Sequence, residues 1–199
     1  MDDSVIRAMA RWPNVPEVYG WMSLDRRGRW CLRGEPVTHR GAIEFMNRNY
    51  GCAAGGRWYF QNGPQRAYVD LDYTPRVFLL DGADDLVDHV GSPVTGLRGA
   101  WLDEEGNLLL LADGGVGLLC DRDLEPVSER LCHADGTPCD EDGIARLLGS
   151  PAEGSSESVY LAWDDARIEI RTLRRDDVPG KFGFEPAPRA GSASLDDAD

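Results

Sequence analysis

The feature that most constrains this chain is a segment, residues 57–75, in which an aromatic stretch is followed by a turn and a strictly alternating run. The stretch from Trp58 to Gln61 leads into the turn Asn62-Gly63-Pro64. In the run that follows, Ala67, Val69, Leu71 and Tyr73 fall on one face, and Arg66, Tyr68, Asp70 and Asp72 on the other. A period of two is typical of a half-buried strand, and Gly and Pro favour a tight turn. The segment predicts a β-hairpin whose apolar face lies on the core.

Composition bounds the class of protein and its partners. The chain has 199 residues, 42% hydrophobic and 28% charged, and can bury a core as one domain or two small ones. A net charge of −14 argues against nucleic acid and anionic membrane as partners, because both bind positive surfaces. Because the chain starts with acidic residues and has no long apolar run, we expect no signal peptide and no membrane span. Five cysteines are therefore expected as free thiols in the cytoplasm.

Hydrophobic periodicity and the placement of Gly and Pro predict an α+β fold with mostly antiparallel sheets. Helices are expected at 4–11 and at 39–50, the second capped by Thr38. Strands are expected at 18–24, 29–33, 58–61, 66–72, 76–80, 99–103, 107–112 and 116–120. The expected domains are an N-terminal segment 1–16, a first α+β motif 17–85, a meander with a second α+β motif 97–188, and a disordered acidic tail 189–199.

The second half of the chain echoes the first. The block from Gly34 to Ile43 aligns with Gly136 to Ala145, and Tyr59 aligns with Tyr160. The alternating positions of the hairpin match as well, with Ala67, Val69 and Leu71 against Ala166, Ile168 and Ile170. The pattern predicts two similar strand–turn–helix–hairpin motifs, a pseudo-duplication in which 158–173 repeats the hairpin. Identities are few, and a chance match is the alternative.

Two clusters contain residue types that bind metals, and each has a simpler interpretation. Cys132, His133 and Cys139 suit zinc, but no second close pair of ligands accompanies them, so small buried hydrophobes are favoured. The run 140–143 resembles the centre of a calcium loop, but Pro138 and Gly149 stand where that loop needs ligands. Capping of a helix at 143–149 by these carboxylates explains the run better. We expect no metal and no cofactor.

Catalytic patterns are equally sparse. The glycine pair Gly55-Gly56 lacks the strand and helix context of a nucleotide-binding loop. A Cys–His dyad formed in space, such as Cys52 with His39, remains open. Asp70 and Asp72 lie about 7 Å apart on one strand face, a spacing that suits paired carboxylates in acid–base chemistry. A solvated charged surface is the simpler interpretation of this pair.

The outer face and turn of the hairpin form the best candidate for a binding site. Flat rings, amides and a guanidinium are the groups enriched where proteins bind partners. The candidate residues are Trp58, Gln61, Asn62, Gln65, Arg66 and Tyr68. The alternative is that both aromatic rings pack beneath the preceding helix while the polar groups only cap the turn.

One stretch resembles a known family. The block Gly28-Arg29-Trp30, the pair Gly34-x-Pro36, the apolar helix, Tyr59-Phe60, Pro64 and the alternation from 68 to 72 resemble the domain-of-unknown-function family numbered 1285 over residues 17–80. The stretches 11–16 and 178–184 are similar to a separate uncharacterised bacterial family. The resemblance implies a two-part α+β protein with repeated motifs and a signalling or regulatory binding role. It implies no catalytic residues.

The sequence therefore favours a non-catalytic cytosolic binding or regulatory protein whose partner is an unknown protein or small molecule. The first alternative is an enzyme with a carboxylate or Cys–His site formed only in the fold. The second is a structural subunit that associates with itself as a homo-oligomer.

Overall fold

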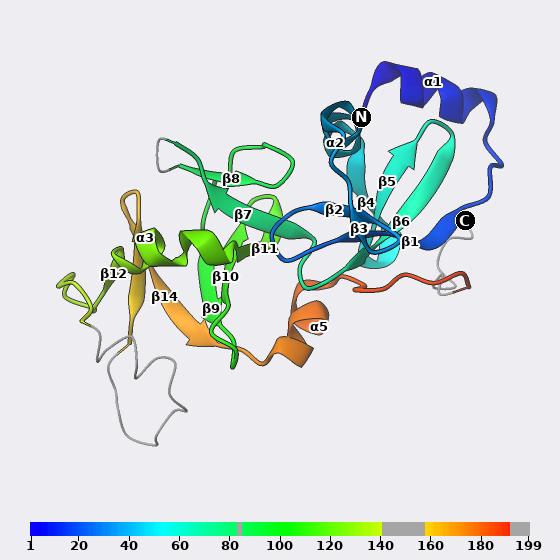
Figure 1. The fold of residues 1–199 in the computed structure, drawn as a ribbon. Helices are drawn as coiled ribbons and strands as arrows, with labels where there is room; N and C mark the ends of the chain where they lie inside the picture. Colours follow the sequence, from blue (N-terminus) through cyan, green and yellow to red (C-terminus); the bar gives the residue numbers. More distant parts are fainter. Residues whose placement is uncertain (83–84, 141–157, 192–199) are drawn as a thin grey trace. The chain divides into compact units, whose positions relative to one another are not determined.

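The computed structural model describes residues 1–82, 85–140 and 158–191, in which strands predominate and form two sheets (Figure 1). The mixed α+β class is therefore confirmed. The chain divides into two compact units. The first unit comprises residues 1–75, 89–92 and 179–199, and the second comprises 76–88 and 93–178. Within the described ranges, no helix has both the length and the apolar character needed to cross a membrane.

The first unit is built on a six-stranded sheet with the order β3-β2-β1-β6-β5-β4. Its strands are β1 (Val18–Leu24), β2 (Trp30–Leu32), β3 (Glu35–Pro36), β4 (Tyr50–Ala53), β5 (Arg57–Asn62) and β6 (Gln65–Leu71). All neighbours are antiparallel except β1 and β6, which pair in parallel with Met22 opposite Val69. The predicted hairpin is confirmed as β5–β6.

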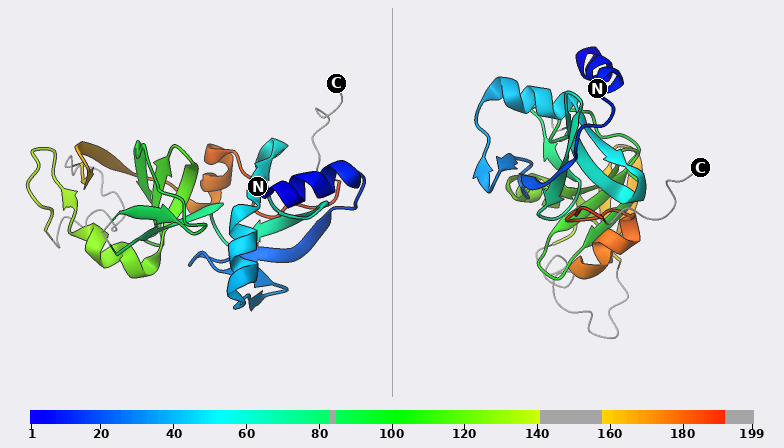
Figure 2. Two further views of the ribbon diagram at one scale, coloured as in Figure 1. Left: turned by 90° about the horizontal axis from the view of Figure 1, so that it is seen from above. Right: turned by 90° about the vertical axis from the view of Figure 1, so that its right-hand side faces the viewer.

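Two helices belong to this unit, α1 (Asp3–Arg11) and α2 (Arg40–Arg48), and a short 3₁₀ turn, η1 (Ala54–Gly56), precedes β5. α2 packs beside β5, where the rings of Phe45 and Phe60 meet edge to face at 5.7 Å (Figure 2). The predicted cap Thr38 is wrong by one residue. His39 is the N-cap, because its Nδ1 accepts a hydrogen bond from the Ala42 N–H at 3.1 Å.

The core of the first unit lies on the sheet face beneath α2. Its buried side chains come from five elements and include Met22, Leu24, Trp30, Met46, Phe60, Val69 and Leu71. The indole Nε1–H of Trp30 donates to Asn47 Oδ1 at 2.7 Å, which satisfies the one polar atom of a ring that is only 1% exposed. The expectation that Val69 and Leu71 face the core is confirmed.

A segment that follows α5 (Val178–Phe182) enters the first sheet where β5 and β6 separate. The Glu185 N–H donates to the Gly56 carbonyl at 3.0 Å, and the Leu71 N–H donates to the Pro186 carbonyl at 2.7 Å. Arg189 Nη1 then donates to Asp70 Oδ1 at 2.7 Å. Residues 184–189 therefore pair with the backbone of Gly56, just before β5, and of Leu71 at the end of β6.

The second unit contains an eight-stranded sheet with the order β12-β13-β14-β9-β10-β11-β7-β8. Its strands are β7 (Arg76–Leu80), β8 (Leu86–Asp88), β9 (Gly99–Leu102), β10 (Leu108–Ala112), β11 (Gly115–Leu119), β12 (Leu131–Cys132), β13 (Tyr160–Trp163) and β14 (Ala166–Thr172). The turns η2 (Asp121–Asp123) and η3 (Arg175–Asp177) and the helix α3 (Leu124–Ser128) complete it. An apolar core that includes Phe78, Leu110, Leu161 and Ile170 holds the sheet together.

The two units differ from the domain ranges expected from the sequence. The strand 76–80 was expected with the first motif, but β7 pairs in parallel with β11 and so lies in the second sheet. Residues 179–188 were expected with the second motif, but they contribute to the first unit. Both differences have one cause, because partners far away in sequence decide where a segment lies, and local pattern does not reveal them.

The segments of the predicted internal match are two antiparallel hairpins preceded by blocks that lie beside different strands. β13–β14 is an antiparallel hairpin like β5–β6. However, the strand pair at 30–36 lies beside β1, whereas the pair at 131–138 lies beside β13. The predicted helix 143–149 and the calcium-like run beyond Asp140 lie outside the described residues, as does the tail beyond 191.

The insertion of residues 184–189 gives a direct test at the two neighbouring glycines. Gly55 and Gly56 both have positive φ, 71° and 72°. A Cβ on Gly55 meets nothing within 4 Å, whereas a Cβ on Gly56 would overlap the Gly183 carbonyl. We expect Gly55→Ala to cost about 1 kcal/mol for the left-handed backbone alone. Gly56→Ala should cost about 2–3 kcal/mol because the inserted segment must also move.

Urea unfolding of both variants measures these free energies, and limited proteolysis reports on residues 184–189. Faster cleavage of that segment is expected only in Gly56→Ala. Equal unfolding free energies and equal cleavage in the two variants would contradict the close packing of the segment.

Candidate functional site

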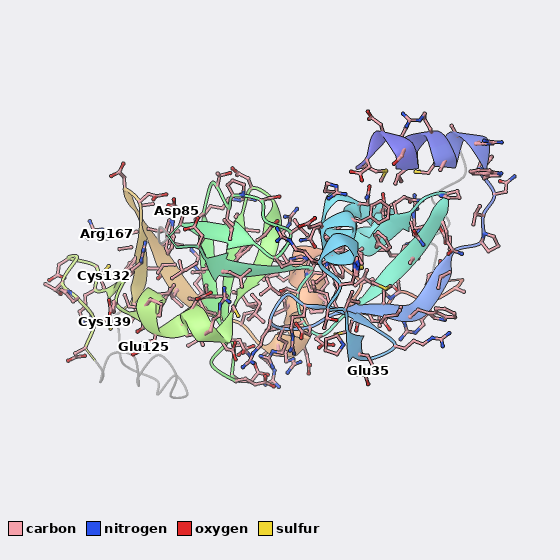
Figure 3. The ribbon with its side chains drawn as sticks, turned by 45° about the horizontal axis from the view of Figure 1, so that its top comes forward. Glu35, Asp85, Glu125, Cys132, Cys139 and Arg167 are labelled. Carbon is pink, nitrogen blue, oxygen red and sulfur yellow. The ribbon has the colours of Figure 1, made fainter. Side chains whose placement is uncertain are left out.

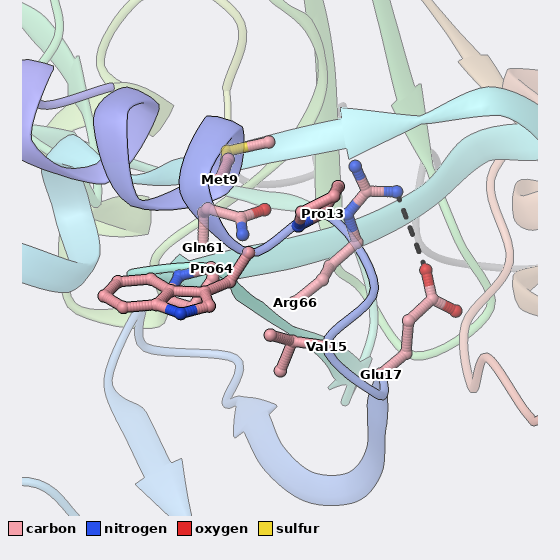
Figure 4. A pocket seen from close by; sticks show the side chains of 8 residues that line it. Met9, Pro13, Val15, Glu17, Gln61, Pro64 and Arg66 are labelled. Atoms are coloured by element: carbon pink, nitrogen blue, oxygen red, sulfur yellow. Dashed lines mark ion pairs between the residues drawn. The ribbon is translucent and has the colours of Figure 1, made fainter.

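A pocket of about 260 Å³ opens in the first unit beside the turn of the β5–β6 hairpin (Figure 4). One wall is α1 and the linker that connects it to β1, and the other is the hairpin itself. The lining residues are Met9, Trp12, Pro13, Val15, Glu17, Gln61, Pro64 and Arg66. Five of these eight residues have apolar side chains, and the other three carry polar groups.

The amide of Gln61 is the least solvated of these polar groups. Gln61 is 1% exposed, and its Nε2 donates to the Gly63 carbonyl at 3.0 Å. That carbonyl can only accept, so the orientation of the amide is determined and Oε1 points away from the turn. Within the described part of the chain, Oε1 is buried and has no hydrogen-bond donor. A buried acceptor left in this state costs about 1–3 kcal/mol.

A carboxylate and a guanidinium stand on the other side of the pocket. Glu17 Oε1 lies 3.8 Å from Arg66 Nη1 and accepts a hydrogen bond from the Tyr68 hydroxyl at 3.2 Å. Glu17 Oε2 accepts from the Tyr19 hydroxyl at 2.5 Å. Both carboxylate oxygens are thus engaged by tyrosines, which hold the carboxylate in place.

Strand register explains why these side chains meet. Residues paired directly in an antiparallel sheet project to the same face, and Gln61 pairs with Arg66 while Tyr59 pairs with Tyr68. The parallel neighbour β1 adds Tyr19, whose ring stacks on Tyr68 at 4.7 Å. The guanidinium carbon of Arg66 lies 4.3 Å from the centre of the Tyr59 ring, a cation–π contact that orients it.

Two pKa values reflect this crowding. Burial raises the pKa of Tyr19 well above its usual value, and the hydrogen bond to Glu17 and the charge of that carboxylate raise it further. Desolvation alone would lower the pKa of Arg66, but the hydrogen bond to Tyr68 and the nearby tyrosines and Glu17 outweigh it, so the pKa of Arg66 is raised. Tyr19 stays neutral and Arg66 stays charged throughout the physiological range.

The structure distributes the six predicted binding residues over different places. Gln61 and Arg66 line the pocket. Gln65 Nε2 donates to the Pro16 carbonyl at 3.2 Å and so braces the linker, and Asn62 is exposed at the turn. Two placements on an exposed outer face were wrong, because Tyr68 is 1% exposed beneath Tyr19 and Gln61 is buried. Trp58 lies on the opposite face, with its ring 4.9 Å from that of Tyr50.

Sequence reasoning missed the other half of the pocket. α1 and the linker contribute Met9, Trp12, Pro13, Val15 and Glu17. The sequence did contain one signal for this half of the pocket: Trp12 lies next to a linker that Pro13 and Pro16 hold extended. In the structure Trp12 is 50% exposed, and an exposed aromatic ring of this size marks a possible binding surface.

The residues of the other candidate sites do not line this pocket. His39 Nδ1 is engaged as the cap of α2, and partial desolvation raises the pKa of the Cys52 thiol, which opposes a reactive thiolate. Burial likewise raises the pKa values of Cys31 and Cys120. Asp70 is paired with Arg189.

The zinc candidates Cys132 and Cys139 lie on one hairpin-like segment of the second unit (Figure 3). Among the described residues, no cluster of three or more His, Cys, Asp or Glu side chains has the geometry of a metal site. Cys132 is buried, and Cys139 packs against the apolar core. These contacts are those of small hydrophobic side chains.

The fold is similar to that of a solved protein from the family numbered 1285. The chain superposes on a DUF1285 family protein from Silicibacter pomeroyi DSS-3 with a TM-score of 0.51 and 14% sequence identity, covering 87% of this chain and 97% of that one. A DUF1285 family protein from Shewanella baltica OS155 gives a TM-score of 0.40 at 11% identity, covering 53% of this chain and 88% of that one. The predicted resemblance is confirmed at the level of fold.

Residues 1–189 match the model of the DUF2944 family, described as "Protein of unknown function (DUF2946)". The chain belongs to this family. No curated protein matches it. The site must therefore be interpreted from its own chemistry.

The Tyr19–Glu17 hydrogen bond predicts how stability depends on pH. A tyrosine whose pKa is raised on folding contributes stability below its unfolded pKa of about 10 and loses that contribution as the pH rises further. We expect Tyr19→Phe to lower the free energy of unfolding by about 1 kcal/mol at pH 7. The difference between wild type and variant should shrink above pH 10. Urea unfolding at pH 7 and pH 11 tests this, and a difference that grows with pH would contradict it.

Proposed function

We propose that this protein is a binding protein without catalytic activity, and that the pocket of its first unit is the binding site. The observation that carries the proposal concerns Gln61, a lining residue of the pocket whose buried Oε1 lacks a donor among the described residues. An unsatisfied acceptor is retained at a cost, and a ligand that donates to it removes that cost. Apolar walls with few oriented polar groups are typical of small-ligand sites.

The composition of the pocket supports binding rather than catalysis. None of its eight lining residues is a cysteine, histidine, serine or lysine. Its one carboxylate, on Glu17, already accepts hydrogen bonds from two tyrosines and lies near Arg66. Both oxygens of this carboxylate are therefore already engaged by hydroxyl donors.

A cytosolic regulatory role without a cofactor agrees with the remaining features. No disulfide joins the five cysteines in the described structure, and thiols of this kind suit a reducing compartment. The net charge of −14 argues against nucleic acid and anionic membranes as partners. The partner in this proposal is a small molecule that changes the stability or surface of the first unit.

Strand order supports the further proposal that the two units arose by duplication. In the first unit the order is β4-β5-β6-β1-β2-β3, and in the second β12-β13-β14-β9-β10-β11 follows the same order. In both, the second strand of the hairpin pairs in parallel with the first strand of the unit's three-stranded antiparallel run, β6 with β1 and β14 with β9. In this comparison β4 of the first unit corresponds to β12 of the second. The match expected from sequence, residues 34–43 against 136–145, is a different one.

Self-association is the alternative binding role. Large apolar side chains are exposed in the first unit, namely Met1, Ile6, Trp12, Trp21 and Leu32. Light scattering at several protein concentrations measures it. A monomer at all concentrations would remove this alternative.

Two tryptophans provide a matched test of the pocket. Trp12 and Trp21 are each 50% exposed, but only Trp12 lines the pocket. We expect small neutral fragments that bind the wild type to bind Trp12→Ala at least about fivefold more weakly, because the aromatic wall of the pocket is lost. Trp21→Ala should bind as the wild type does. Ligand-observed NMR with a fragment library is the measurement. Equal effects of the two substitutions, or no binding by the wild type, would refute the proposed site.

A further inference from the structure

We propose that the ligand of this pocket is a small neutral molecule with an amide, whose N–H donates to Gln61 and whose carbonyl accepts from Arg66, and with an apolar group beside it. This inference rests on the proposed binding function of the pocket. Four features of the pocket carry it: an acceptor, a donor, a balanced charge and an apolar wall.

The acceptor is Gln61 Oε1. The Gly63 carbonyl holds Nε2 at 3.0 Å, so the amide cannot rotate to present its N–H groups to a ligand without losing that bond. Figure 4 shows the amide beside Met9, Pro13 and Pro64. A ligand group at this position must therefore donate a hydrogen bond. Because Oε1 has almost no exposed surface, a ligand N–H reaches it only when a neighbouring lining side chain moves, and Met9, an unbranched side chain with three rotatable bonds, is the lining residue best suited to move.

The donor is the guanidinium of Arg66, which is directly opposite Gln61 in the strand register. Their Cβ atoms are therefore about 4.5–5.5 Å apart on one face. Within the described residues, the guanidinium makes one hydrogen bond, a long one of 3.5 Å to the Tyr68 hydroxyl. The remaining N–H groups are available to a carbonyl, because a guanidinium has five donors.

The charge of the pocket is balanced. Glu17 lies 3.8 Å from Arg66, so an anionic ligand would meet a fixed carboxylate and a cationic ligand would meet a fixed guanidinium. A neutral group that both donates and accepts avoids either repulsion. An amide does this with its N–H and C=O on adjacent atoms.

The apolar wall and the volume of the pocket determine what kind of group the amide of the ligand carries. Met9, Trp12, Pro13, Val15 and Pro64 offer apolar surface but no side-chain carboxylate or amine. A volume of about 260 Å³ lies just below the roughly 300–1,000 Å³ typical of sites for drug-sized ligands. A single ring or branched alkyl group attached to the amide fits this space.

Matched probes test the inference on the full chain. N-methylphenylacetamide and methyl phenylacetate differ only in N–H against O, and both keep the carbonyl. We expect the wild type to bind the amide about tenfold more tightly than the ester, by NMR titration. Gln61→Met should bring this ratio close to one while both probes still bind. Arg66→Met should weaken both probes, and Asn62→Ala, at the exposed turn, should change neither.

The charged analogues phenylacetate and phenethylamine should each bind more weakly than the amide. The amide of the natural ligand belongs either to a peptide main chain or to a free small molecule, and a capped tripeptide with a central phenylalanine distinguishes the two. Tighter binding of the tripeptide than of the small amide probe indicates a peptide. Weaker binding indicates a free small molecule. Equal affinity for amide and ester in the wild type, or tighter binding of either charged analogue, would overturn the inference and leave the binding pocket standing. If Gln61→Met does not fold, the wild-type ratio decides. Failure of every probe and fragment to bind would overturn the proposed function itself.

Discussion

The pocket depends on one pairing, the parallel contact of β1 with β6. It places the start of β1 beside the middle of a hairpin more than forty residues further along the chain. Through it, Tyr19 stacks on Tyr68 and Glu17 comes within reach of Arg66. The linker that precedes β1 must then run past the hairpin turn, where Gln65 holds the Pro16 carbonyl. Without this pairing, α1 and the hairpin would have no reason to enclose a space together.

The same neighbourhood shows how the chain handles buried polarity. Arg66, Glu17, Tyr68 and Tyr19 form a connected network in which both carboxylate oxygens have donors. Gln61 stands next to this network with one atom satisfied and the other not. Networks of this kind rigidify a site when complete, and an incomplete member is where a ligand contributes most. The contrast between satisfied and unsatisfied groups on one sheet face is what distinguishes the pocket from an ordinary polar surface.

Local pattern was enough to predict most of the elements. The alternation from Ala67 to Leu71 and the apolar runs of β7, β10 and β11 are visible in the sequence, because strand period and turn chemistry are local properties.

The residues of the site could be predicted only in part. Gln61 and Arg66 belong to the hairpin that the pattern singles out, but Met9 and Trp12 reach it through tertiary contacts. Tyr68 was placed on the solvent side because alternation does not reveal that β1 supplies a covering ring. The cap at His39 was missed because an imidazole nitrogen rarely substitutes for a hydroxyl or carboxylate oxygen.

The insertion of residues 184–189 between β5 and β6 has a consequence for synthesis. The first unit is discontinuous in sequence, and its final pieces follow the whole of the second unit. A ribosome that has made the first sheet therefore holds it with the backbone groups of Gly56 and Leu71 still unpaired. Domains generally fold in the order in which they emerge, but here the earlier unit is completed last. Until residue 189 has left the ribosome, the first sheet of the nascent chain lacks its hydrogen bonds to Glu185 and Pro186. The second unit must fold while the first is still incomplete in this way.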